Sequence, residues 1–153
     1  MERPYRSPIE IPALVKDYLY NKTFCELGCG DGDLLKEFAK YADVVYGIEN
    51  DQLCFEKLDK LKDNPKINII HGDILSVCPK CDVYYVWIRY KIMEKLMLCL
   101  SPKATIITHE AKNNLIISQT YFTNPIYIDF VTHEKPIIPW PEDPLTISIR
   151  PGI

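Results

Sequence analysis

The chain has 153 residues, of which 47% are hydrophobic and 25% charged, and its net charge is −3. This composition is far from that of disordered proteins, and the length suits one globular domain with a substantial core. No basic surplus is present to neutralise phosphates, so nucleic acid is expected to be an unlikely partner. No apolar run reaches the roughly 20 residues of a membrane span. We therefore expect a cytoplasmic monomer.

The first 22 residues are predicted to form an arm and a helix. Residues 1–12 are rich in proline, which favours an extended segment. Apolar side chains then recur at helical spacing from Ile11 to Tyr20. This helix is expected to pack on a sheet.

Residues 23–35 are predicted to be a short strand, a glycine turn and the start of a helix. Gly28, Gly30 and Gly32 permit a sharp turn and let a ligand approach the backbone. The residue three positions after Gly30 is Asp33, so the dinucleotide-binding pattern is not met, and the chain has no Gly-Lys-Ser/Thr of a Walker loop. The segment is therefore a binding loop of another kind.

Carboxylates surround this glycine turn, since Glu26, Asp31 and Asp33 all lie in or beside it. They disfavour a phosphate and favour a cationic ligand. The Glu-Leu-Gly-Cys-Gly-Asp-Gly segment resembles the first motif of class I S-adenosylmethionine-dependent methyltransferases, whose cofactor carries a sulfonium and an α-ammonium. The resemblance implies that Glu26, Gly28 and Gly30 bind this cofactor. The alternative is a turn that only joins a strand to a helix.

A second predicted strand, residues 44–48, ends at Glu49. Glu49 lies about 20 positions after Gly28, where nucleoside-binding folds place a carboxylate for the ribose hydroxyls. Its two oxygens can accept from both vicinal hydroxyls. We expect Glu49 and its neighbour Asn50 to contact the cofactor, whereas the alternative for Glu49 is a solvated strand end.

A helix over residues 51–62 and a third strand over residues 66–71 are predicted next, and the strand leads into Gly72-Asp73-Ile74. The resemblance implies that Asp73 accepts a hydrogen bond from the adenine amino group and that the backbone amide of Ile74 addresses a ring nitrogen. Aspartate is also frequent in ordinary turns.

The fourth predicted strand, residues 82–88, should end beside the methyl group, because open α/β sheets bind ligands beyond their strand ends. Enzymes that methylate base amines of DNA, or glutamine, typically carry Asn/Asp-Pro-Pro-Tyr here, whereas this chain has Val-Trp-Ile-Arg-Tyr. An amide or a base amine is therefore expected to be an unlikely acceptor. Trp87 and Tyr90 are our candidate catalytic residues, because aromatic faces suit a cationic acceptor side chain. Tyr85, in mid-strand, is expected to be a core residue.

The fold class expected from this order is α/β, a Rossmann-like mostly parallel sheet with helices on both faces and a C-terminal antiparallel hairpin. The remaining predicted elements are a helix over 90–100, a strand over 104–108 followed by His109, and hairpin strands over 126–134 and 145–150. One methyltransferase domain, 1–153, would then comprise the arm and helix (1–22), the cofactor-binding core (23–110) and the hairpin region (111–153).

The six cysteines of the chain include one pair with metal-site spacing, Cys78 and Cys81. A structural zinc site usually needs a second such pair, and the sequence has none. We therefore expect no metal.

The whole chain resembles the small archaeal protein-lysine methyltransferases and their mitochondrial relatives. The likeness includes the Tyr-x-Ser-Pro lead-in, the motifs described above and Thr-His-Glu after the fifth strand. It implies that Tyr5 and Ser7 fold over the methionine end of the cofactor and that the substrate is a protein lysine. The alternatives are a small-molecule methyltransferase and a non-catalytic S-adenosylmethionine-binding partner protein.

Overall fold

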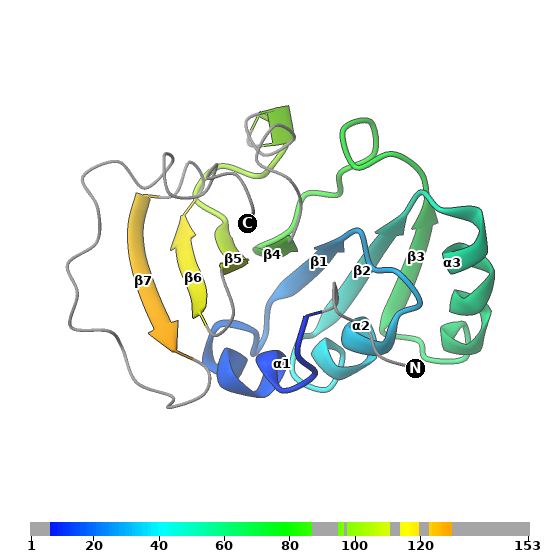
Figure 1. Ribbon diagram of the computed structural model, residues 1–153, viewed down its shortest axis with the longest axis horizontal. Coiled ribbons are helices and arrows are strands. Elements are labelled where there is room, and N and C mark those ends of the chain that lie inside the picture. Colours follow the sequence, from blue (N-terminus) through cyan, green and yellow to red (C-terminus); the bar gives the residue numbers. More distant parts are fainter. Residues whose placement is uncertain (1–6, 87–94, 97, 111–113, 120–122, 130–153) are drawn as a thin grey trace.

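The computed structural model describes residues 7–86, 95–96, 98–110, 114–119 and 123–129 (Figure 1). Within them, one seven-stranded sheet has the order β3-β2-β1-β4-β5-β6-β7. Strands β1 to β5 run parallel to one another, whereas β6 is antiparallel to both of its neighbours, β5 and β7. The strands are β1 (Thr23–Leu27), β2 (Val44–Glu49), β3 (Ile67–His71), β4 (Val83–Val86), β5 (Thr105–Glu110), β6 (Asn114–Gln119) and β7 (Thr123–Asp129).

The described helices are short and lie between the early strands. Two of the predicted helices, 11–20 and 51–62, are each a brief α-helix followed by a 3-10 turn. Asp51 caps the second of them by accepting hydrogen bonds from the amides of Leu53 and Cys54. The helical elements are α1 (Ile11–Leu14), η1 (Lys16–Tyr18), α2 (Asp33–Phe38), α3 (Gln52–Lys57) and η2 (Leu58–Leu61).

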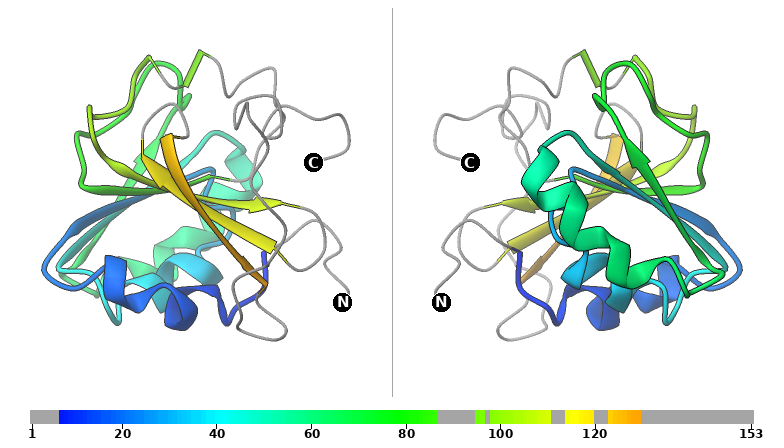
Figure 2. Two further views of the ribbon diagram at one scale, coloured as in Figure 1. Left: turned by 90° about the vertical axis from the view of Figure 1, so that its left-hand side faces the viewer. Right: turned by 90° about the vertical axis from the view of Figure 1, so that its right-hand side faces the viewer.

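Alternation along the strands gives the sheet two apolar faces. Figure 2 shows α1, α2 and α3 together on one face. There, Phe24 of β1 stacks on Phe38 of α2 with ring centroids 4.1 Å apart. The opposite core contains Tyr84 and Ile106 from the sheet, with Leu96 and Leu100 packed over them. Both faces are therefore covered, and the predicted Rossmann-like fold class is confirmed.

The antiparallel strand pair is confirmed, but it uses different residues from those expected. β6 (Asn114–Gln119) pairs with β7 (Thr123–Asp129), whereas we predicted strands over 126–134 and 145–150. Residues 130–153 lie outside the described part of the chain. Leu-Ile-Ile in β6 is a short apolar run without polar alternation, a pattern that does not distinguish a strand from other buried segments. Its pairing with β5 decided the outcome.

Among the described residues, no helix has both the length and the apolar character needed to cross a membrane.

The Tyr84 hydroxyl organises the loops at the amino ends of β4 and β5. Tyr84 is fully buried. Its hydroxyl donates to the Pro79 carbonyl at 2.6 Å, accepts from the Cys81 amide at 2.9 Å, and lies 3.0 Å from the Ser101 hydroxyl. One side chain thus joins two loops that are far apart in the sequence.

Tyr84→Phe should lower the free energy of unfolding by roughly 1 to 3 kcal/mol, because it leaves buried backbone groups without a partner. Urea unfolding measures the change. Tyr46→Phe, at a half-buried tyrosine of the same core, is the control and should change it by less than about 0.5 kcal/mol. Equal effects would show that the Tyr84 hydroxyl contributes nothing particular.

Candidate functional site

The carboxyl ends of the parallel strands meet at one edge of the sheet, where open α/β folds bind ligands. In Figure 1 the arrowheads of β1, β2 and β3 point toward this edge. The glycine loop follows β1, Glu49 ends β2, and Asp73 lies in the loop after β3. Most of the predicted cofactor-binding residues are thus at one edge.

Backbone hydrogen bonds attach the glycine loop to the end of β2. The amides of Gly28 and Cys29 both donate to the Ile48 carbonyl at 2.9 Å. Gly28 and Gly30 have φ angles of 83° and 57°, which favour glycine. A Cβ added at either glycine would meet no atom of the described residues within 4 Å, so these residues leave the outer side of the loop open to a ligand.

The Glu49 carboxylate bridges the glycine loop and the start of α3. One oxygen accepts from the Gly30 amide at 2.7 Å, and the other accepts from the Asp51 amide at 2.8 Å. Each carboxylate oxygen has room for a second hydrogen bond, so both oxygens can still accept from the hydroxyls of a ribose. Next to it, the Asn50 side chain is exposed, and the Asn50 carbonyl lies 3.3 Å from His71 Nε2.

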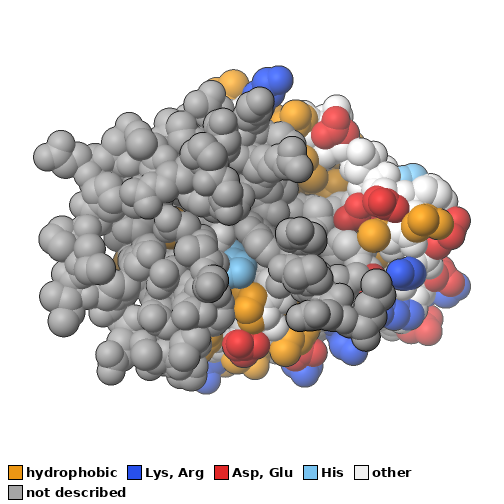
Figure 3. Space-filling model, viewed as in Figure 1, with side chains coloured by type: hydrophobic (Ala, Val, Ile, Leu, Met, Phe, Trp, Pro, Cys, Tyr) orange, Lys and Arg blue, Asp and Glu red, His pale blue; other side chains and the backbone are white. Residues whose placement is uncertain are grey.

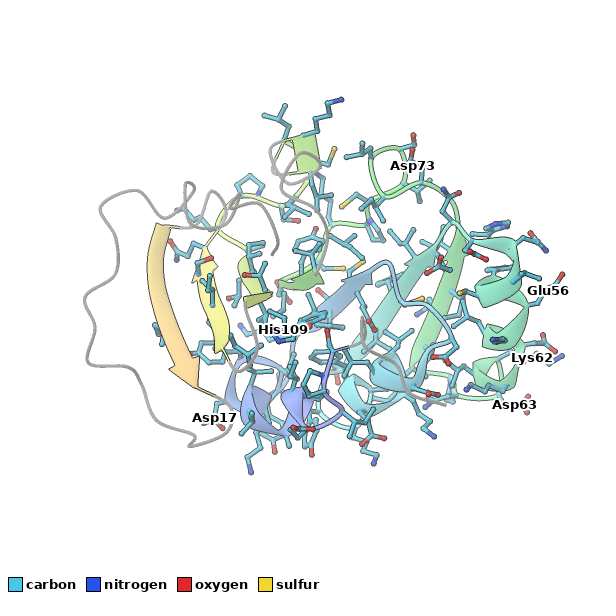
Figure 4. The ribbon with its side chains drawn as sticks, in the orientation of Figure 1. Asp17, Glu56, Lys62, Asp63, Asp73 and His109 are labelled. Atoms are coloured by element: carbon cyan, nitrogen blue, oxygen red, sulfur yellow. The ribbon has the colours of Figure 1, made fainter. Side chains whose placement is uncertain are left out.

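Asp73 and Ile74 form part of a tight turn after β3. The Asp73 side chain is exposed, and its Oδ1 accepts from the Leu75 amide at 2.9 Å. Figure 4 shows Asp73 in this loop. Ile74 is half-buried against the core that contains Tyr84. The contacts are those of an ordinary aspartate turn, and the adenine-binding role of both residues stays a prediction.

Glu26 is the most unusual residue of the site. Only 5% of it is exposed, and its Oε1 has no hydrogen-bond partner among the described residues. Burial raises the pKa of the Glu26 carboxyl well above its usual range, and the charges of Glu49 and Asp31 raise it further. A buried acceptor without a partner costs about 1 to 3 kcal/mol. A cationic group bound at this point would supply the partner.

Ser7 is attached to Tyr85, the residue of β4 that is paired with Glu26 in the sheet, by a hydrogen bond that the sequence did not indicate. The Ser7 hydroxyl bonds to the Tyr85 hydroxyl. Burial raises the pKa of Tyr85, and the charge of Glu26 adds to this effect. Tyr85 packs against Phe38 with ring centroids 5.6 Å apart, as expected of a core residue. Its hydroxyl also ties the N-terminal segment to the site.

The structure thus brings Glu26, Gly28, Gly30 and Glu49 together, with Ser7 beside them. Tyr5, Trp87 and Tyr90 lie outside the described residues, and their roles stay predictions. Within the described ranges, no group of three or more His, Cys, Asp or Glu side chains could hold a metal ion.

S-adenosylmethionine fits this site on two observations. Its α-ammonium and sulfonium are the kind of cation that the orphaned Glu26 oxygen lacks. The open side of the loop at Gly28 and Gly30 allows a ligand to contact the backbone. Glu26 and the glycine loop would hold the charged end of the cofactor, and Glu49 would hold the ribose.

Glu26→Gln should reduce the pH dependence of stability of the cofactor-free protein. A carboxyl whose folded pKa lies above its unfolded value of 4.5 keeps a proton that the unfolded chain releases. The free energy of unfolding therefore falls as pH rises from that value toward the raised pKa. The neutral amide removes this term, and should bring roughly 1 to 3 kcal/mol of stability near neutral pH.

Urea titrations of both proteins at an acidic and a neutral pH test this effect of Glu26. If the wild-type protein and the variant lose stability equally between the two pH values, Glu26 ionises normally and the expectation is wrong. Calorimetry should also show weaker S-adenosylmethionine binding by the variant.

Glu49→Gln should weaken S-adenosylmethionine binding at least tenfold, or about 1.4 kcal/mol. The amide nitrogen would face one of the two backbone amides from which Glu49 now accepts a hydrogen bond. The substitution therefore breaks one hydrogen bond that positions the loop and removes an acceptor for the ribose. Calorimetry measures the dissociation constant. Glu56→Gln, at an exposed position of α3 (Figure 4), makes the same chemical change away from the loop and should have no effect. Similar affinities for the two variants would contradict a role for Glu49.

A comparison of the sequence with known protein families finds one matching family. Residues 14–125 match the family described as ribosomal RNA adenine dimethylase. The match covers more than half of the chain and includes the glycine loop, Glu49 and the parallel strands. No curated protein matches the chain.

Three solved structures illustrate the fold. A candidate RNA methyltransferase from Pyrococcus horikoshii has a TM-score of 0.58 and 19% identity, over 71% of this chain and 62% of its own. A dimethyladenosine transferase from Plasmodium falciparum has a TM-score of 0.56 and 22% identity, over 69% of this chain and 43% of its own. The complex of aTrm5 with tRNALeu has a TM-score of 0.55 and 21% identity, over 68% of this chain and 34% of its own. The chain thus spans less than two thirds of these proteins.

These comparisons overturn two expectations, a protein substrate and the exclusion of nucleic acid. The matching family is described by its action on ribosomal RNA, and one structural neighbour is bound to tRNA. The likeness to protein-lysine methyltransferases finds no support. The expectation failed because the net charge of −3 is a sum over the whole chain, whereas nucleic acid responds to the charge of one surface.

The family match and the site lead to the same class of protein. The matched residues contain the loop whose open backbone and unpartnered carboxylate oxygen fit a cationic nucleoside cofactor. The structural neighbours are class I methyltransferases. The chain therefore belongs to the ribosomal RNA adenine dimethylase family of S-adenosylmethionine-dependent methyltransferases, and S-adenosylmethionine is its cofactor.

Proposed function

We propose that this protein methylates RNA. The observation that carries the proposal is the family match over residues 14–125, a range that includes the cofactor loop and the five parallel strands. The neighbours described as an RNA methyltransferase, a dimethyladenosine transferase and a tRNA complex support it at the level of the fold. The acceptor is a base of RNA, presented at the carboxyl edge of the sheet.

The protein's part in this reaction is binding and alignment. The cofactor supplies a methyl group on a sulfonium, so no covalent nucleophile of the protein is needed. Glu49, held by the amides of Gly30 and Asp51, fixes the nucleoside part of the cofactor. Glu26 offers its buried oxygen to the cationic part. Holding donor and acceptor in line can supply much of the acceleration of such a displacement.

The segment after β4 is where the acceptor should lie. Enzymes that methylate exocyclic base amines typically carry Asn/Asp-Pro-Pro-Tyr there, whereas this chain has Val-Trp-Ile-Arg-Tyr at residues 86–90. We propose that Trp87 and Tyr90 stack on the target base, because enzymes that act on bases commonly hold an unstacked base against aromatic side chains. Analysis of the methylated nucleoside identifies the acceptor atom.

Other expectations from the sequence remain proposals. These are the contacts of Tyr5, Asn50, Asp73 and Ile74 with the cofactor, a single domain over 1–153, and a cytoplasmic monomer.

Incubation with labelled S-adenosylmethionine and total RNA should place label in RNA. Digestion to nucleosides and mass spectrometry then identify the methylated base. Glu49→Gln should reduce the rate about tenfold or more at a limiting cofactor concentration, because it weakens cofactor binding. Glu56→Gln should leave the rate unchanged.

The same reaction is run with a cell lysate treated with ribonuclease. Label in protein or in small molecules of this lysate, together with no label in the total RNA of the first reaction, would reject the proposal. Tight cofactor binding without any methyl transfer would favour a non-catalytic binding protein. N6-methylated adenosine in the digest would show that the Trp-Ile-Arg-Tyr segment serves the chemistry that the family name describes.

A further inference from the structure

A pocket of about 320 Å³ lies at the edge of the sheet opposite the cofactor site. Its walls come from the residue before β1 and from the segments that lead into β4 and β5. Its polar and charged lining side chains are Lys22, Lys80, Asp82, Ser101, Lys103 and Thr105. Its size is within the range of ordinary ligand sites. None of its lining residues belongs to the cofactor site described above.

The charge of this pocket is positive, although the protein as a whole is negative. Three lysines and one aspartate line it, while the net charge of the chain is −3. The aspartate, Asp82, is already engaged, because its Oδ2 accepts from the amide and the hydroxyl of Thr23 at 3.0 and 3.1 Å. These bonds lower the pKa of Asp82, so it stays ionised and offsets one of the three cations.

Some other described lysines form ion pairs, whereas these three do not. Lys60 pairs with Asp33 at 2.9 Å and Lys62 with Asp59 at 3.3 Å. Figure 3 shows Lys/Arg and Asp/Glu side chains interspersed over the side of the molecule that carries α3. Within the described residues, by contrast, no carboxylate lies within ion-pair distance of Lys22, Lys80 or Lys103. Lys22 still attracts Asp82 at longer range, so the three ammonium groups leave a net positive charge for a ligand.

The walls of the pocket are held rigidly. The Tyr84 hydroxyl bonds to Pro79 and Cys81 on one wall and contacts Ser101 on the other. Lys80 Nζ donates to the Cys99 carbonyl at 3.3 Å, which leaves further donors on the ammonium. Lys103 has a φ of 64°, a conformation that costs a non-glycine residue roughly 1 to 2 kcal/mol. A lysine is thus kept at the tip of this turn at a cost in stability.

We propose that this pocket binds a backbone phosphate of the RNA substrate, with Lys22, Lys80 and Lys103 as its ligands. The inference rests on the proposed function, since it names a second contact for the same substrate. Lysine is a common phosphate ligand because its ammonium is a compact charge with several donors. Thr105 and Ser101 add hydroxyl groups to the lining. None of the described residues that line the pocket is aromatic, so this lining suits a phosphate better than a stacked base.

The position of the pocket implies a minimum length of substrate. β1 has five residues, so the cofactor edge and the pocket are separated by roughly 16 Å along the strands, at 3.3 Å per residue. A target nucleotide with one neighbour on each side cannot reach from one edge to the other. A longer RNA can follow the outer surface of the domain from one edge to the other and place a phosphate in the pocket.

The test compares two double variants of equal charge. Lys22→Ala with Lys103→Asn removes two of the proposed ligands, and asparagine tolerates the positive φ at position 103. Lys80 is kept because it caps a carbonyl. Lys36→Ala with Lys57→Ala removes two exposed lysines of α2 and α3. Methylation kinetics are measured with a long RNA and with a trinucleotide around the methylated position, at several salt concentrations.

The pocket variant should raise the KM for the long RNA about tenfold. In a plot of log(kcat/KM) against log[salt], the slope should become less steep by roughly 1 to 2. The kcat, the S-adenosylmethionine dissociation constant and the KM for the trinucleotide should not change. The control variant should behave as the wild-type protein does with both RNAs.

Several outcomes would overturn the proposal. These are equal KM values for the two double variants with the long RNA, an equal effect on the trinucleotide, or competition by polyglutamate that is stronger than that by an RNA of equal charge.

Failure of the proposed function would look different, since the wild-type protein would then label no RNA at all. In that case a titration with inorganic phosphate, followed by NMR of the Ala104 and Thr105 amides, tests the pocket alone. Shifts that are absent from the pocket variant support a phosphate site, and unchanged spectra reject it.

Discussion

The site depends on the hydrogen bonds that join the glycine loop to the end of β2. Two amides of the loop donate to the Ile48 carbonyl, and the Gly30 amide donates to the Glu49 carboxylate. Glu49 also holds the start of α3 through the Asp51 amide. The strand end, the loop and the helix are therefore positioned by one carboxylate and one carbonyl. Positive φ angles at Gly28 and Gly30 make this close approach compatible with an open outer surface.

Electrostatics then decides which ligand suits this frame. Glu26, Asp31 and Glu49 lie close enough to raise the pKa of Glu26, whose burial has the larger effect. In the cofactor-free protein, one carboxyl oxygen of Glu26 has no partner among the described residues, which costs stability at the binding site. A cationic ligand reverses this cost and an anionic one increases it. The site is thus selective for charge before any contact with a particular atom is considered.

The two edges of the sheet differ in charge. The carboxyl edge gathers Glu26 and Glu49, and the amino edge of β1, β4 and β5 gathers three lysines. The acidic edge suits the cationic cofactor, and the lysines of the amino edge attract the polyanionic backbone of an RNA. The buried Tyr84 hydroxyl connects the two loops of the amino edge, so the fold of the sheet and the placement of these charges are not independent.

The sequence by itself determined the fold class, the positions of the parallel strands along the chain and, through the resemblance of its glycine motif, the cofactor. These are local properties: glycine spacing, the acidic residue at each strand end and the periodicity of apolar residues all act over a few positions. It failed where distant segments decide. β6 is assigned by its pairing with β5, the Ser7 and Tyr85 hydroxyls meet across the chain, and the lysine pocket combines three separate segments. The substrate class was misjudged for the same reason, because net charge is additive along a sequence, whereas recognition depends on which charges the tertiary structure brings together.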